Sequence, residues 1–180
     1  CELHPDTTFI FPHLLFLAGD LARLYRFMQS HPNAVLDLAP GDYLYGELYS
    51  HYEDARAFLR TFSRRVFFGT NGRWFPEHLE QLPQRGTLAN AEATRRLLRF
   101  LTSNGEIDNP YEPTRPQLPT LRGLRLPEPV LDAVFYQSFG DLMAGRAAAL
   151  GLGPEQAGTT GTGGVDGYLA QFTERLSAMG

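Results

Sequence analysis

The chain has 180 residues, of which 43% are hydrophobic and 12% aromatic, so it can build a core and is not a disordered segment. Its formal net charge of −4 gives no electrostatic footprint for nucleic acid and no polybasic patch for a membrane surface. The single cysteine, Cys1, excludes an internal disulfide and a cysteine-rich metal site, and it favours a reducing, cytoplasmic location.

Three apolar, aromatic or β-branched runs predict β-strands that start near Thr8, Ala34 and Arg65. The starts are 26 residues (8 to 34) and 31 residues (34 to 65) apart, a spacing that suits β-α units with parallel strands. Two of the runs are almost continuously hydrophobic, which is typical of strands buried on both faces in a barrel or a doubly wound sheet. We therefore expect an α/β fold.

Helices are predicted between these strands. The first begins after Asp20, a good N-cap residue, and ends at His31, because the residue before a proline is pushed out of the helical region. The second has one apolar face, formed by Tyr52, Ala55, Phe58, Leu59 and Phe62. Residues 40–50, between the second strand and this helix, contain several Gly and Tyr residues and predict a long loop at the strand's carboxyl end.

The remainder of the chain has weaker periodicity. Residues 72–88 and 104–123 are predicted as loops, and residues 91–101 and 127–143 as helices. Residues 151–167 predict a Gly/Thr-rich linker and residues 168–180 a terminal helix, which leaves residues 1–150 as the folded unit.

Each predicted strand ends in a polar side chain: His13, Asp37 and Asn71. Because parallel strands present their carboxyl ends to one crevice, these three groups are expected to converge. Structural interpretations stay open: His13 as a merely exposed strand-end residue, Asp37 as a cap for a loop amide, and Asn71-Gly72 as a turn.

Four segments in order, residues 9–14, 19–21, 31–41 and 65–71, resemble the amidohydrolase-related (amidohydrolase 2) family. They match strands six to eight of its (β/α)8 TIM barrel, and the resemblance covers roughly residues 1–145. Residues 123–139 are similar to the family's closing helix, with Ser138 where the family has Asn. Residues 1–5 resemble the end of a helix, so we expect this chain to be the C-terminal part of a longer protein.

The resemblance implies a divalent metal, often zinc, at the carboxyl mouth of the barrel. His13 would be the strand-six histidine, which binds metal or deprotonates the attacking water. Asn71 stands where the family has its catalytic, metal-binding Asp. Asp37 would lie behind the ligands or contact substrate, and His78 would contact substrate; the remaining ligands are expected upstream of this chain.

The resemblance implies a metal-dependent hydrolase that attacks a small-molecule C–N or C–O bond with activated water. Alternatives are a non-oxidative decarboxylase on the same site, or an impaired barrel that serves as a binding module. The second alternative follows from Asn71, because an amide has no basic site and general-base assistance typically contributes about 10²–10⁴-fold. Since three strands cannot close a barrel, we also expect the chain to be unstable alone or to associate, and a homo-oligomer is left open.

Overall fold

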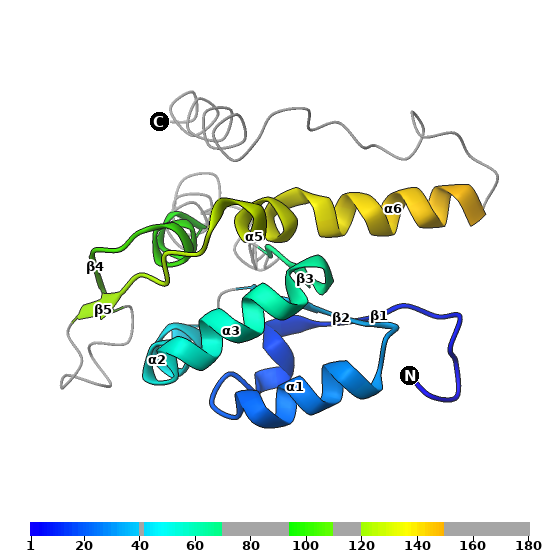
Figure 1. The fold of residues 1–180 in the computed structure, drawn as a ribbon, viewed down its shortest axis with the longest axis horizontal. Coiled ribbons are helices and arrows are strands. Elements are labelled where there is room, and N and C mark those ends of the chain that lie inside the picture. Colours follow the sequence, from blue (N-terminus) through cyan, green and yellow to red (C-terminus); the bar gives the residue numbers. More distant parts are fainter. Residues whose placement is uncertain (40–41, 70–93, 110–119, 150–180) are drawn as a thin grey trace, which may run out of the picture.

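The computed structural model describes residues 1–39, 42–69, 94–109 and 120–149 (Figure 1). Two predicted site residues, Asn71 and His78, lie outside this part of the chain, as do the predicted linker and terminal helix. The elements in chain order are β1 (Phe9–Phe11), η1 (Pro12–Phe16), α1 (Leu21–Ser30), β2 (Ala34–Asp37), α2 (Asp42–Ser50), α3 (Tyr52–Phe62), η2 (Ser63–Arg65), β3 (Val66–Phe67), a helix over 94–102, β4 (Glu106–Asp108), β5 (Thr120–Arg122), α5 (Glu128–Asp132), η4 (Ala133–Gln137) and α6 (Ser138–Ala149).

The three predicted strands form one parallel sheet in the order β1-β2-β3. Ile10 lies opposite Val35, and Leu36 lies opposite Val66. The predicted parallel pairing of β-α units is therefore confirmed. The described residues form no closed barrel, and the assignment to strands six to eight of a TIM barrel stays a prediction.

One edge of this sheet is open in the described part of the chain. The Phe9 N–H donates to the Asn33 carbonyl at 2.9 Å, so in the alternating pattern of a parallel ladder the Ile10 peptide groups point away from β2. The Ile10 side chain is 51% exposed. β1 is thus an apolar edge strand, the kind of element that can pair with another chain.

The two predicted crossover helices are confirmed. The Asp20 carboxylate accepts the Arg23 N–H at 3.0 Å and begins α1, which ends at His31 before Pro32. α3 buries the predicted face except for its first residue, Tyr52, which is half-buried. Helices α1 and α3 pack on the sheet face that carries the fully buried side chains of Ala34, Leu36 and Val66.

The predicted loop over residues 40–50 is wrong, because residues 42–50 form α2. Leu44, Tyr45 and Leu48 are buried, and the Tyr45 ring packs edge-on against Phe100 at 5.3 Å between centroids. Burial of this apolar stripe outweighs the low helix propensity of the Gly and Tyr residues that favoured a loop.

The predicted loop over residues 104–123 is also wrong in part, because β4 and β5 pair as antiparallel strands within it. Each strand has three residues and buries only its middle side chain, Ile107 or Leu121. With one buried residue per strand, the sequence alternates too briefly for these strands to be distinguished from a loop. The helix over residues 94–102 falls where a helix was predicted.

The helix predicted over residues 127–143 is confirmed, and it continues through α5, the π-helical turn η4 and α6 to Ala149. In Figure 1 the sheet lies between α1 on one side and α6 on the other. The Phe68 N–H donates to the Val134 carbonyl at 2.9 Å, and the rings of Phe67 and Phe139 are 5.9 Å apart. This helical run therefore covers β3 on the face opposite α1. Within the described residues, no helix has the length and apolar character needed to cross a bilayer.

Candidate functional site

His13 lies in η1, directly after β1, in a left-handed stretch of backbone. Its φ and ψ angles are 55° and 37°, and Leu14, Leu15 and Phe16 also have positive φ. A left-handed conformation costs a non-glycine residue roughly 1–2 kcal/mol, so four in succession must be held by their surroundings. The Leu14 side chain is fully buried and supplies part of that hold.

Asp37, at the end of β2, supplies another part. Its Oδ1 accepts the His13 N–H at 3.0 Å and the Ala39 N–H at 2.9 Å. His13 and Asp37 therefore lie together at the carboxyl edge of the sheet, as expected from the parallel strands. By accepting the Ala39 N–H, the carboxylate also caps a neighbouring loop amide, which is the structural interpretation that the sequence allows for Asp37.

The His13 ring is oriented by the backbone of the same loop. Nδ1 lies 2.8 Å from the Ala39 carbonyl oxygen. A carbonyl can only accept, so Nδ1 carries the proton and the neutral ring has its lone pair on Nε2. The ring also packs at a tilt against Phe16, with 5.2 Å between centroids. The arrangement fixes which nitrogen can act as a base or bind a cation.

The third strand end approaches the same place. β3 is followed by Phe68 and Gly69, and a Cβ added to Gly69 would lie 2.9 Å from the Ala39 Cβ and 3.0 Å from its nitrogen. The chain therefore passes directly over the residue that accepts the His13 hydrogen bond. Asn71 follows two residues later, outside the described part of the chain.

The next question is whether the side chains near His13 fit a metal ion. Within the described residues no group of three or more His, Cys, Asp or Glu side chains is arranged to hold an ion. His13 by itself fits the pattern of a metal-binding histidine, whose second ring nitrogen donates to a backbone carbonyl. Among the described residues, His13 therefore belongs to no such group of three.

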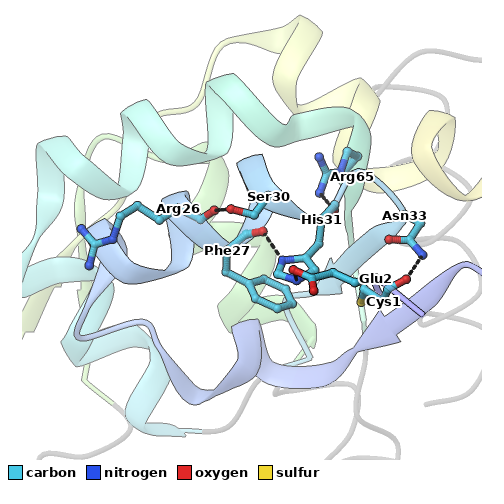
Figure 2. Close-up of polar contacts among 8 residues, drawn as sticks. All are labelled: Cys1, Glu2, Arg26, Phe27, Ser30, His31, Asn33 and Arg65. Carbon is cyan, nitrogen blue, oxygen red and sulfur yellow. Dashed lines mark hydrogen bonds and ion pairs between the residues drawn. The ribbon is translucent and has the colours of Figure 1, made fainter. Parts of the chain in front are cut away.

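An open depression of about 420 Å³ lies at the opposite, amino edge of the sheet, lined by Cys1, Glu2, Leu3, His4, Phe9 and His31. Figure 2 shows its polar contacts: the His31 Nδ1 lies 2.9 Å from the Phe27 carbonyl, and Nε2 lies 3.7 Å from the Glu2 carboxylate. The Asn33 amide nitrogen lies 2.8–3.3 Å from the carbonyl oxygens of Cys1, His4 and Thr7.

These contacts anchor the first residues to the sheet. The first residues form turns, with His4 donating to Cys1 and Thr7 to His4, so the expectation that residues 1–5 end a helix is wrong.

Arg65 is a residue whose role the sequence did not reveal. It lies just before β3, and its guanidinium donates to the carbonyls of Met28, His31 and Ala34 at 2.8–3.0 Å. Figure 2 shows the bond to His31. Burial lowers the pKa of Arg65 from its usual value. Its partners are backbone groups far away in sequence, so no residue pattern could have signalled them.

The chain was compared with protein-family models, curated proteins and solved structures, and no significant match was found in any of them.

Proposed function

We propose that this chain carries part of the active site of a metal-dependent hydrolase of the amidohydrolase type, which cleaves a C–N or C–O bond of a small molecule. The observation that carries the proposal is the His13 ring at the carboxyl edge of the parallel sheet. The Nδ1–H is donated to Ala39, which places the lone pair of the neutral ring on Nε2.

In this proposal His13 takes a proton through Nε2 or binds the cation through it. When Nε2 gains a proton the ring becomes positively charged, and its Nδ1–H bond to the Ala39 carbonyl becomes charge-assisted and stronger. The same bond holds the ring still, so Nε2 keeps its direction throughout the transfer. When bound, a divalent cation, zinc by the resemblance, would supply Lewis acidity at this edge.

The sequence feature that weighs against hydrolysis is Asn71 in place of the family's Asp. An amide offers a neutral oxygen and cannot take a proton, which favours the binding-module alternative. The decarboxylase alternative uses the same His13 geometry, and product analysis with a carboxylated substrate separates it from hydrolysis.

The proposal is tested on the longest form of the protein that its gene encodes. Zinc content by mass spectrometry and hydrolysis of an ester and amide panel are measured for the natural protein and for His13→Ala, Asn71→Asp and His51→Ala. His51 is exposed before α3, with no side-chain bond to the helix, so His51→Ala is the matched control.

We expect His13→Ala to lower zinc content or to reduce hydrolysis by about 10²-fold or more, and His51→Ala to change neither. Asn71→Asp should raise both. A His13→Ala protein that keeps its zinc and its rate refutes the proposal. If Asn71→Asp gains neither, position 71 is not part of the site.

We further propose a cytoplasmic location, supported by the single cysteine, and a small-molecule substrate.

A further inference from the structure

We propose that Asp37 is a positioning residue: its Oδ1 atom sets the tautomer of His13 by fixing the two backbone segments that the His13–Ala39 hydrogen bond joins. The tautomer itself is a property of this chain. Its use in catalysis rests on the proposed hydrolase function.

Three hydrogen bonds close a ring around Oδ1. The N–H groups of His13 and Ala39 both donate to this one oxygen, at 3.0 and 2.9 Å. The His13 Nδ1 then donates to the carbonyl of the same Ala39 at 2.8 Å. Asp37 therefore holds both ends of the bond that orients the imidazole.

The backbone around His13 needs such an anchor. The turn from His13 to Phe16 is left-handed in four successive non-glycine residues, a conformation that relaxes if its support is removed. The His13 N–H is at the start of this turn, and a carboxylate oxygen is a stronger acceptor for it than a neutral group. Removing the Asp37 carboxylate should therefore let the turn shift and take the ring away from Ala39.

The same geometry commits one carboxylate oxygen of Asp37 to the backbone. Its Oδ1 is directed at two backbone donors at the base of the loop. The structural consequence is specific: this position needs an oxygen acceptor, which the carboxylate supplies in its stronger form. Asn can provide that oxygen, whereas Ala cannot.

The test reads the His13 tautomer by long-range ¹H–¹⁵N NMR at about pH 9, where histidine side chains are generally neutral. It uses the 180-residue chain without added metal or substrate. The variants are Asp37→Ala and Asp37→Asn. The control is Asp20→Ala, which also removes one carboxylate that accepts a backbone N–H, but at the start of α1.

The natural chain and the Asp37→Asn and Asp20→Ala variants should show the Nδ1–H form of His13. Asp37→Ala should lose it and show an averaged mixture with the Nε2–H form. Retention of the Nδ1–H form in Asp37→Ala, its loss in Asp37→Asn, or an Nε2–H ring in the natural chain each overturn the proposal.

If Asp37→Ala does not fold, the decision rests on Asp37→Asn and on amide hydrogen exchange in the natural chain. The His13 and Ala39 amides should be protected because both are bonded to Oδ1. Free exchange at either amide overturns the proposal. The two proposals can fail separately. If the His13 and Ala39 amides are protected and His13 is in the Nδ1–H form, but the protein binds no zinc and hydrolyses no substrate, the role of Asp37 stands and the hydrolase function is refuted.

Discussion

Arg65→Met should destabilise the fold strongly, and the reason lies in a proline. In α1 the Met28 carbonyl would ordinarily accept from the N–H of the residue four positions later, which is Pro32 and has none. Arg65 replaces that donor with two, since Nη1 and Nη2 both lie 2.9 Å from the Met28 oxygen. Methionine keeps an apolar chain of similar length but offers no donor.

The magnitude follows from the acceptors that lose their donor. An unpaired buried carbonyl costs about 1–3 kcal/mol, and both Met28, which is fully buried, and Ala34 lose the Arg65 bond. The His31 carbonyl keeps its bond from the Ala34 N–H at 3.0 Å. The variant no longer has to bury a charged guanidinium, and the removal of this desolvation penalty offsets part of the loss. We expect a net loss of about 2–4 kcal/mol in the free energy of unfolding.

The neighbouring residue gives a matched control. Arg64 forms an ion pair with Asp141 at 2.7 Å, with both side chains more than 60% exposed, and such surface pairs contribute about 0–1 kcal/mol. Urea unfolding of Arg65→Met and Arg64→Met, followed by far-UV circular dichroism at concentrations where the chain is monomeric, compares the two. An Arg65→Met variant within about 1 kcal/mol of Arg64→Met would refute the reasoning.

Three further predictions concern the turn, the long helix and the sheet edge. Phe16→Gly should exceed Phe16→Ala in unfolding free energy by about 0.5–1 kcal/mol, because both variants remove the ring and only glycine relieves the φ of 57°; equal or lower stability of Phe16→Gly in urea would contradict the left-handed turn. Burial, and then the hydrogen bond and charge of Asp132, raise the pKa of Tyr136 to about 12, above its ordinary value of 10.0. Neutral Tyr136 therefore stabilises the fold below pH 10, and this contribution is lost as the pH rises from 10 to 12. Over this range the melting temperature of Tyr136→Phe should fall less than that of the natural chain. Ile10→Lys should reduce concentration-dependent association in sedimentation experiments, whereas Leu3→Lys, at an exposed position outside the sheet, should not; a monodisperse natural monomer would rule out edge association.

The meeting of His13 and Asp37 was predictable because it depends on topology. Strands that run in parallel and start at regular intervals must bring their carboxyl ends to one edge, whatever their exact lengths. The helices α1 and α3 were predictable for a similar reason, since each has a cap or an apolar stripe that one sequence window contains. The third strand end, at Asn71, remains a prediction.

Features that depend on contacts distant in sequence were not predictable. After His13, nothing in the run favours a left-handed turn, because the next three residues are two leucines and a phenylalanine. The start of the turn is bonded to Asp37, 24 residues further along the chain. α2 was predicted as loop because its Gly and Tyr residues were weighed locally, while its burial against Phe100 is tertiary.

Gly69 gives the candidate site a dependence that its chemistry does not suggest. Because a methyl group there would collide with Ala39, any side chain on Gly69 must displace Ala39, the residue whose carbonyl oxygen orients His13. The direction of the His13 ring thus depends on a position beyond the end of β3, where the absence of a side chain leaves room for Ala39. A screen for loss of the activity proposed for His13 should therefore recover substitutions at Gly69, although Gly69 has no reactive group of its own.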